Sequence, residues 1–423
     1  MANLPDDIRR NILSRVPVKN LMRFKTVCKP WYSLIRSPLL GKLHCANASK
    51  TGTSSSFIMF RCCFKNKGNV IYSIDYRSLS SKLLSSATCN PLGDSSEMDF
   101  PPRSANCRQL WGSYRKEFEI ILGSSKGLMC LRSKKPGYED AICLWNPCTR
   151  EYKTVPESPH NFRSSSTGVD IGLYGLGYDE ENGDFKVVRV AQVDSRAECF
   201  DYSVDESETE VLEFGRSYSV YQIYTLGSNS WKKCQTMAYK FHGELKSGVM
   251  VNGALHWWAI KRRDGYEAII SFDFTDEIFR EVAIIEGSMK HPPGSFKAYE
   301  NNNVGVLGGC LCVLHKTLDK VDVWVMHEYG INESWMKHFT VTEESVLETT
   351  SLRIVCDFAN SAVLFKTDDS MIYYDPNHET QRTRKLTVPG TDNLYGAGIC
   401  EISLMPLYSG TYCEKIKTYL RIG

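Results

Sequence analysis

The sequence predicts two parts of different fold class, a small all-α unit of three helices at the N-terminus and an all-β, β-propeller-like domain behind it. Apolar residues recur at helical spacing near the N-terminus, strand-like runs separated by turn residues follow, and these runs form a loose internal repeat. We expect the helical unit over residues 1–45, a Gly/Ser/Thr linker over 46–56, the β domain over 57–410 and a tail over 411–423.

Three short helices are expected in the N-terminal unit, and each begins near a proline. Pro5 suits a first helical position because its missing N–H needs no partner there, so the first helix should run to about Ser14. Val16-Pro17 breaks that helix and starts a second one, and Pro30 opens a third. Three helices in so few residues form a poor independent core, so the unit has more apolar surface than it can bury alone.

Composition excludes several classes of protein. The chain of 423 residues is 42% hydrophobic and 24% charged, as globular proteins are, and its net charge of +2 indicates neither a nucleic-acid nor a membrane partner. No apolar run is long enough to span a bilayer and no signal peptide is evident, so we expect a cytosolic or nuclear protein. The sixteen cysteines then remain thiols. Their spacing fits no zinc motif, and we expect neither a metal nor a cofactor.

Charge is nevertheless unevenly distributed along the chain. Residues 1–45 contain nine basic side chains and two acidic ones, a net charge of +7, which suits an acidic partner.

Six units of similar pattern follow the linker. In each, an apolar strand enters a polar turn and a second strand begins near an aromatic or basic residue. The units cover residues 70–84, 142–156, 220–234, 269–284, 321–341 and 371–388. We expect no amphipathic helix of convincing length after residue 50. Six antiparallel units without helices favour a β-propeller, because radial closure protects the strand edges.

The stretch LPDDIRRNILSRVPVKNLMRFKTVCKPWYSLIRSP, residues 4–38, resembles the F-box of plant proteins. That family's pattern is LPxxL/IxxxILxRLPxKxLxRFKxVCKxWxxLIxSP. About fifteen positions match in one register, which makes the signal specific. Val16 stands where the family usually has Leu. The resemblance implies docking onto the small Skp adaptor of an SCF ubiquitin ligase and, through that adaptor, onto a cullin.

The same resemblance assigns the adaptor-facing surface, or the core that supports it, to a set of mostly apolar residues. These are Leu4, Pro5, Ile8, Ile12, Leu13, Val16, Pro17, Leu21, Val27, Cys28, Trp31 and Leu34. The surplus apolar surface of the helical unit would then be covered by a partner. A purely intramolecular cap on the larger domain is the alternative.

The β domain resembles the F-box-associated domain of plant F-box proteins, a divergent kelch-like propeller. Four segments match sequence motifs that recur in that domain: YGLGYDEENGDFKVVRV at Tyr174–Val190, LGSNSWKK at Leu226–Lys233, FDFTDEIFREV at Phe272–Val282 and DVWVMHEYGINESWMKHFTV at Asp322–Val341. The wording VWVMHEYGINESW is similar to the S-locus F-box group, which works in pollen against secreted style ribonucleases.

Together the two resemblances imply a non-catalytic substrate receptor. The F-box would dock the Skp adaptor, and the propeller would capture a protein for ubiquitination and proteasomal degradation, in which proximity supplies the catalytic gain. A style ribonuclease in pollen self-incompatibility is one expected substrate. The alternatives are a receptor for a defence or hormone-signalling protein, and a propeller lectin or enzyme with a helical cap.

An acidic insertion is the candidate substrate-steering loop. It contains Asp194, Glu198, Asp201, Asp205, Glu206, Glu208, Glu210 and Glu213, opposed only by Arg196. Long loops on rigid scaffolds commonly carry recognition, and this charge would speed association with a basic protein partner. A solvated surface loop without a binding role is the alternative.

Two sequence features could indicate an enzyme or a ligand-binding site. Gly123–Gly127 matches GxSxG with Ser125 as the would-be nucleophile, but a strand on either side indicates a β-turn rather than a nucleophile elbow. Trp257 and Trp258 must point to opposite faces of one strand. One of them is expected in the core, and the other packs between blades or serves as a ligand platform.

Overall fold

The computed structural model describes most of the chain. The described residues are 4–51, 55–64, 68–85, 90–98, 118–133, 141–158, 170–194, 217–241, 246–284, 302–378, 383–388, 390–391 and 393–407. The tail expected over 411–423 lies outside them.

Four helices form the N-terminal helical unit, residues 4–51. They are α1 (Asp6–Leu13), α2 (Val18–Phe24), α3 (Lys29–Ile35) and α4 (Pro38–Thr51). The first three confirm the predicted helices within one or two residues, and Pro5 and Pro17 directly precede α1 and α2. A proline at such a position costs no hydrogen bond, because the first N–H groups of a helix have no partner inside it.

Helix α4 corrects the expected boundary between the two domains. It runs unbroken to Thr51, so residues 46–51 are helical although they were assigned to a Gly/Ser/Thr linker. Small residues such as Ala46 and Ala48 are good helix formers. Helix α4 is held by contacts with residues far away in the sequence, such as Leu404. Its apolar residues show little helical periodicity, so the sequence pattern did not predict it.

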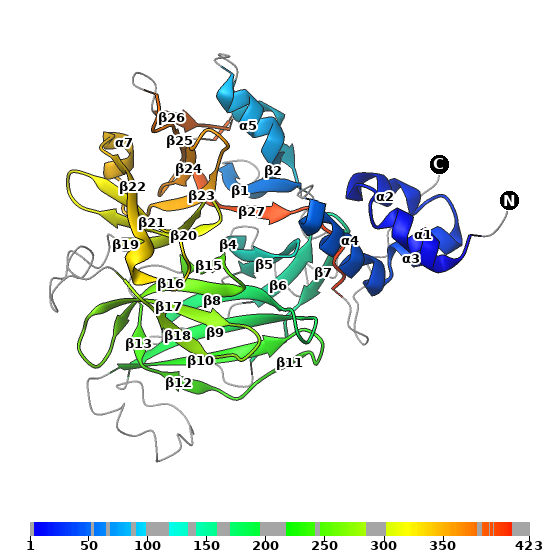
Figure 1. Cartoon of the computed structure of the whole chain (residues 1–423), viewed down its shortest axis with the longest axis horizontal. Helices are drawn as coiled ribbons and strands as arrows, with labels where there is room; N and C mark the ends of the chain where they lie inside the picture. The colour runs from blue at the N-terminus through cyan, green and yellow to red at the C-terminus, as the bar shows by residue number, and fades with distance from the viewer. Residues whose placement is uncertain are drawn as a thin grey trace.

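Six antiparallel sheets follow and form a ring of blades (Figure 1). Blade 1 contains β27 (Leu394–Glu401), β1 (Ser56–Phe64), β2 (Gly68–Asp75) and β3 (Ser96–Glu97). Blade 2 contains β4 (Phe118–Ser125), β5 (Leu128–Ser133), β6 (Ala141–Asn146) and β7 (Glu151–Thr154). Blade 3 contains β8 (Asp170–Asp179), β9 (Asp184–Asp194), β10 (Ser217–Thr225) and β11 (Ser230–Trp231), with β12 (Gln235–Met237) on β10 and β14 (Lys246–Ser247) on β8.

The remaining blades repeat this order. Blade 4 contains β13 (Tyr239–Lys240), β15 (Val249–Val251), β16 (Ala254–Lys261), β17 (Glu267–Asp273) and β18 (Phe279–Val282). Blade 5 contains β19 (Asn302–Leu307), β20 (Cys310–Lys316), β21 (Val321–Met326) and β22 (Trp335–Val341). Blade 6 contains β23 (Arg353–Asp357), β24 (Val363–Lys366), β25 (Met371–Tyr374) and β26 (Thr383–Leu386). Between strands lie α5 (Tyr76–Leu84), η1 (Pro91–Asp94), η3 (Asn332–Ser334) and α7 (Glu344–Leu347).

The predicted repeat corresponds to the two outer strands of a blade. Its polar turn has a shared physical basis in three blades, where an Asn or Asp side chain accepts a backbone N–H two residues ahead. Asn146 Oδ1 accepts from Cys148 (2.9 Å), Asp273 Oδ1 from Thr275 (2.7 Å) and Asp375 Oδ1 from Asn377 (3.0 Å). The propeller expected from the repeat is confirmed.

One repeat unit was interpreted wrongly. Residues 76–84, expected as turn and strand, form the nine-residue helix α5, whose N-terminal Ser78 N–H is capped by Asp75 Oδ1 at 2.9 Å. Leu79 and Leu83 are four residues apart and both are buried against blades 1 and 6. A single such pair was too short a pattern to be recognised as a helix in the sequence.

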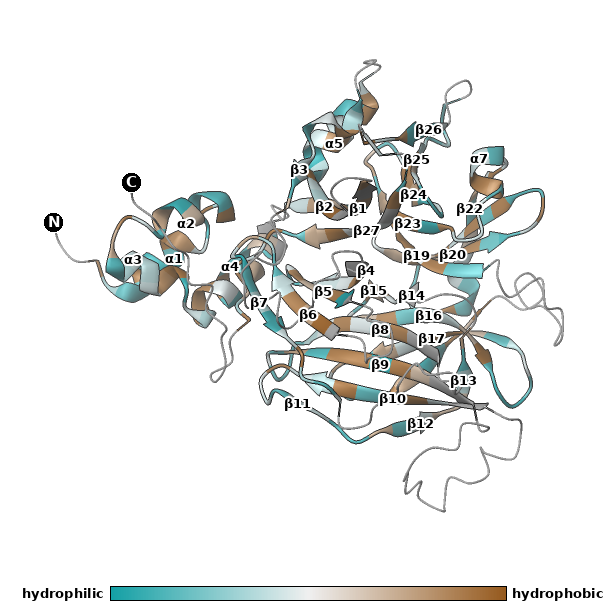
Figure 2. Ribbon diagram, turned by 180° about the vertical axis from the view of Figure 1, so that it is seen from behind, coloured by the Kyte–Doolittle hydropathy of each residue, from teal (hydrophilic) through white to brown (hydrophobic). Residues whose placement is uncertain are grey.

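The two tryptophans of β16 confirm the predicted alternation. Trp257 packs in the core between blades 3 and 4, and Trp258 packs in the core between blades 4 and 5. Both are almost fully buried, at 2% and 6% exposure, so neither forms an open ligand platform. Figure 2 shows the strands of the blades as largely hydrophobic, in keeping with such packing on both faces of each sheet.

Ring closure joins the last strand to the first sheet. β27 pairs antiparallel with β1, from Ser56 opposite Glu401 to Cys62 opposite Leu394. The innermost strands of successive blades contact one another, including β27 with both β4 and β23. Segments that are more than 300 residues apart in the sequence are thereby held in one sheet, in which β1 is paired on both sides and β27 is the innermost strand of blade 1.

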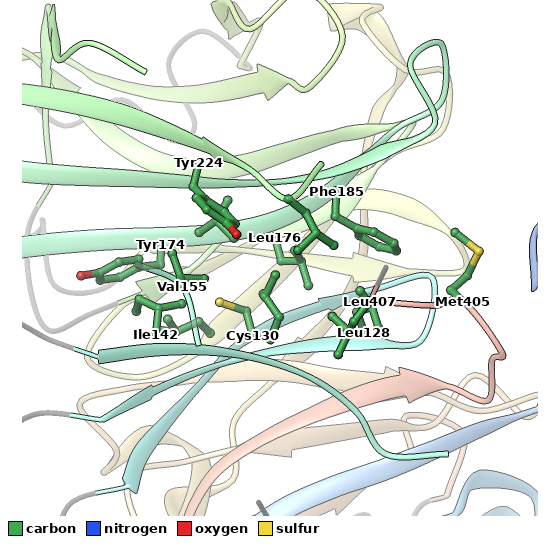
Figure 3. Close-up of a cluster of buried hydrophobic side chains, with 14 of the residues drawn as sticks. Leu128, Cys130, Ile142, Val155, Tyr174, Leu176, Phe185, Tyr224, Met405 and Leu407 are labelled. Atoms are coloured by element: carbon green, nitrogen blue, oxygen red, sulfur yellow. The ribbon is translucent and has the colours of Figure 1, made fainter. Parts of the chain in front are cut away.

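The chain continues past β27 as a short extended segment, residues 402–407, which we call the clamp. Met405 and Leu407 insert into the core between blades 2 and 3 beside Leu128 (Figure 3). The fully buried Asn146 donates from Nδ2 to the carbonyl oxygens of Ser403 (3.2 Å) and Met405 (2.9 Å). The clamp is therefore fixed to the propeller by both apolar packing and buried hydrogen bonds.

The clamp also supports the helical unit. Leu404 is buried in the same cluster as Leu13, Leu21 and Leu40, so one residue of the propeller side completes the helical core. Three short helices were expected to form too small an apolar core alone, and Leu404 supplies part of that core. The helical unit and the propeller share a core instead of being joined by a flexible linker.

Gly41 of α4 permits this close approach and gives a direct test. A Cβ at this position would lie 2.8 Å from the Leu404 carbonyl oxygen and 3.0 Å from Pro406 Cδ. Gly41→Ala should lower the free energy of unfolding by about 1–3 kcal/mol, although alanine normally favours a helix. Chemical denaturation measures the change. Gly93→Ala is the matched control, since nothing lies within 4 Å of its Cβ position; an equally stable Gly41→Ala protein would contradict the clamp.

Candidate functional site

An exposed apolar stripe of the helical unit lies on α1 and just before it. Leu4, Ile8 and Ile12 are 50%, 44% and 53% exposed, and their spacing of four residues places them in one stripe along the helix. A stripe of this kind is normally buried. Here the neighbouring Leu13 is the α1 residue that enters the core, at 2% exposure, and the stripe faces solvent.

The surface is held in shape by a small core beneath it. Leu13, Leu21 and Ile35 come from three different helices and are each at most 2% exposed. Phe24 and Trp31 pack edge to face with ring centroids 5.3 Å apart. The helices therefore keep fixed positions, and the stripe does not have to be ordered when a partner binds.

The structure divides the twelve residues expected at the adaptor into three groups. Leu4, Pro5, Ile8, Ile12, Pro17, Val27 and Cys28 are exposed; Val16, Trp31 and Leu34 are half-buried; Leu13 and Leu21 are buried. The expectation covered both a contact surface and its supporting core, and the burial separates the two roles. Whether the exposed group contacts an adaptor stays a prediction.

Sequence reasoning missed three exposed apolar residues of the helical unit. Tyr32 on α3 is 46% exposed, and Leu39 and Leu43 on α4 are 47% and 39% exposed. Leu39 and Leu43 are four residues apart, which is the signal that could have found them. They were overlooked because the third helix was taken as the last one.

Ionic and polar contacts reinforce the junction between the helical unit and blade 2. Arg36 Nη2 lies 3.5 Å from Glu151 Oε1, which is mostly buried. Burial raises the pKa of Glu151, while the charges of Lys25 and Arg36 oppose that shift. Burial also lowers the pKa of His44 on α4, whose Nε2 donates to the Val16 carbonyl oxygen at 2.9 Å. The junction thus contains charges on both sides, besides its apolar core.

The helical unit occupies one face of the propeller, the face with the β4–β5 and β8–β9 turns. A Cβ on Gly183, in the β8–β9 turn, would lie 2.7 Å from Lys42 Nζ of α4, and one on Gly127, in the β4–β5 turn, would overlap Ser403 of the clamp. Successive connections of an antiparallel sheet alternate between its two ends. The β5–β6 and β9–β10 connections therefore open on the opposite face, which we call the distal face.

The acidic insertion belongs to the β9–β10 connection. Asp194 ends β9 and is paired with Ser217 at the start of β10, so the insertion leaves and re-enters the propeller on the distal face. The other seven acidic residues of the expected steering loop, Glu198, Asp201, Asp205, Glu206, Glu208, Glu210 and Glu213, lie outside the described residues. The steering loop stays a prediction.

The GxSxG segment around Ser125 forms a turn between two strands. Ser125 ends strand β4, and Lys126 and Gly127, with φ of 48° and 81°, form the tight turn into β5, as expected for a β-turn in place of a nucleophile elbow. Among the residues that the structure describes, no group of three or more His, Cys, Asp or Glu side chains could hold a metal ion. Within the same part of the chain, no helix is long and apolar enough to cross a membrane.

Comparison with known families gives two matches. Residues 108–399 match the model described as an F-box associated beta propeller domain, and residues 1–43 match the F-box domain model. The first match covers the propeller from blade 2 into β27, and the second covers most of the helical unit.

Individual relatives cover most of the chain. F-box protein CPR1 of Arabidopsis thaliana is 28% identical over 96% of this chain and 89% of its own length. An F-box/kelch-repeat protein of Arabidopsis thaliana is 26% identical over 91% of this chain and 94% of its own. Among solved structures, TolB from Acinetobacter baumannii superposes with a TM-score of 0.40 at 11% identity, covering 86% of this chain and 72% of TolB.

Proposed function

Because this chain belongs to the family of F-box proteins with an F-box-associated β-propeller, we propose that it is the substrate-recognition subunit of an SCF-type ubiquitin ligase. The α1 stripe docks the Skp adaptor, which links the chain to a cullin. The propeller captures a protein substrate. The chain itself performs no bond chemistry, and the gain in rate comes from holding the substrate near the ubiquitin donor.

The exposed stripe is the observation that carries this proposal. Leu4, Ile8 and Ile12 face solvent on a preformed helical unit whose core is already complete, so they are not needed for its packing. An apolar stripe that does not pack in its own chain favours a partner over an intramolecular cap. The net charge of +7 over residues 1–45 suits a partner with an acidic surface.

The shared core gives this receptor a fixed geometry. Since Leu404 packs among the helices and Met405 packs between blades 2 and 3, the clamp connects the two functional surfaces through a few residues. A substrate held on the distal face would keep one orientation relative to the ligase core. Such positioning supports transfer to a limited set of lysines.

The identity of the substrate is a more specific proposal. A style ribonuclease is one candidate, supported by the resemblance of residues 323–335 to the S-locus group, and a defence or hormone-signalling protein is the other. We place the function in the cytosol or nucleus, in keeping with the thiol-rich composition.

Substitution of the stripe tests the adaptor contact. Ile8→Ala combined with Ile12→Ala should weaken binding to a purified Skp adaptor by at least about tenfold, because two exposed aliphatic anchors are lost. Isothermal titration calorimetry measures the affinity, and unchanged thermal unfolding shows that the fold is kept. Leu318→Ala is the matched control, since Leu318 is 99% exposed on the propeller. Equal affinity for wild type and double variant would sink the assignment. Point variants are preferable to removing residues 1–45, since that deletion would cut through α4.

Neutralising the acidic insertion tests the steering proposal. We expect Glu206→Gln with Glu208→Gln to recover fewer basic proteins from plant extract at low salt, since electrostatic steering weakens as charge is removed. Mass spectrometry of the captured proteins gives the comparison. Glu344→Gln with Glu348→Gln, two exposed residues on and beside α7, is the control. A set of captured proteins that depends on neither the variant nor the salt concentration would remove steering from the mechanism.

A further inference from the structure

Five basic residues converge on the distal side of the propeller. Arg61, Arg132, Arg189, Arg353 and Lys366 come from five strands, β1, β5, β9, β23 and β24, in four different blades. We call this set the cationic mouth. Three of its members lie at the distal ends of their strands, since Arg132 is next to last in β5, Arg353 is first in β23 and Lys366 is last in β24. Arg61 and Arg189 lie in the middle of β1 and β9.

Two of these cations face each other directly. Arg353 and Lys366 are register partners on neighbouring strands, an arrangement that destabilises a sheet when both side chains have the same charge. Arg61 adds a third charge nearby. The pKa of Lys366 is lowered to about 8, chiefly by burial and also by the charges of Arg353 and Arg61, against the opposing effect of Asp368 and Asp369. The positive charge here is thus concentrated enough for its members to affect one another.

The other two cations connect to this group across the centre of the ring. Arg353 Nη1 donates to Ser247 Oγ at 3.1 Å, and Ser247 is the register partner of Tyr174 on β8. Tyr174 is in turn opposite Arg189, and the Arg132 guanidinium carbon lies 5.7 Å from the Tyr174 ring centroid. Register pairs and side-chain contacts therefore connect Arg132, Arg189, Arg353 and Lys366, and the charge of Arg61 acts on the same group.

Burial divides the five cations into a buried group and a group that solvent can reach. Arg132, Arg189 and Lys366 are 4%, 3% and 8% exposed and interact within the chain, so they contribute positive potential and not surface that a partner can reach. The four arginines also make other interactions within the chain, which fix their side chains. Arg61 and Arg353 remain partly exposed and provide the approach from solvent. Fixed guanidinium groups bind carboxylate and phosphoryl oxygens with two parallel hydrogen bonds.

Exposed apolar side chains lie on the same face. Leu318, in the β20–β21 turn, is 99% exposed, and Tyr266, in the β16–β17 connection, is 42% exposed. Both connections open on the distal face, as the β5–β6 connection does. A protein chain could contact this apolar rim, whereas a free inorganic anion would not use it.

We propose that the cationic mouth binds an anionic segment of the protein partner, one that carries carboxylate or phosphoryl groups. This inference rests on the proposed function, for which it identifies the capture site and the chemistry of the captured segment. It is compatible with the acidic insertion, because a partner can present a basic surface to the insertion and an anionic segment to the mouth.

Peptide binding by the full chain in complex with the Skp adaptor tests the proposal. Three fluorescent peptides of one length are used, in which Leu and Gly alternate with Glu, with phosphoserine or with Gln. We expect the Glu or the phosphoserine peptide to bind and to weaken with added salt, and the Gln peptide to bind at least about tenfold more weakly. The two anionic peptides distinguish a carboxylate-rich partner from a phosphorylated one. Absence of binding by both, or equal binding of the Gln peptide, would overturn the proposal.

Substitutions in the cationic mouth test whether the anionic peptide binds there. Arg353→Gln and Arg61→Gln should each weaken binding of the anionic peptide roughly tenfold, since each removes a charged hydrogen-bond donor. Arg353→Lys should weaken it less, because lysine keeps the charge but cannot form two parallel hydrogen bonds. Lys385→Gln, which removes an exposed cation from β26, the outermost strand of blade 6, is the matched control and should change little. Unchanged affinity in both glutamine variants would contradict the site. Adaptor binding measured on the same samples separates this failure from failure of the proposed receptor role.

Discussion

The path of the chain after β27 is the constraint on which the rest of the structure depends. One strand closes the ring against β1, and the next six residues, the clamp, pack between blades 2 and 3 and under the N-terminal helices. Asn146 ties the clamp to a blade turn with buried hydrogen bonds. Ring closure, clamp position and helical core are therefore coupled, and loss of one exposes buried polar groups in another.

This coupling explains how a small helical unit can present an apolar stripe without collapsing onto it. The core residue Leu404 is supplied from the propeller side, so the helices do not need Ile8 or Ile12 for stability. The stripe is left for binding. The proposed cationic mouth lies toward the distal face, away from the helical unit. The proposed adaptor surface and the proposed capture site are thus on opposite sides of one scaffold.

The sequence predicted what depends on local patterns. Prolines marked the starts of the helices, and the Asx turns at Asn146, Asp273 and Asp375 produced a repeat that indicated blades. The rest depends on contacts distant in the sequence. Helix α4 is stabilised by the clamp more than 350 residues away, and the cationic mouth joins strands of four blades. No window of sequence contains either arrangement, so neither could be predicted from spacing alone.

Native-state hydrogen exchange at α4 tests the central claim most directly, because the claim is that this helix belongs to the core and is not a linker. The account predicts that amides between Leu40 and Asn47 exchange as slowly as those of β27, since both become exposed only when the clamp detaches. Exchange of those α4 amides at the rate of an unstructured peptide, while β27 stays protected, would contradict it.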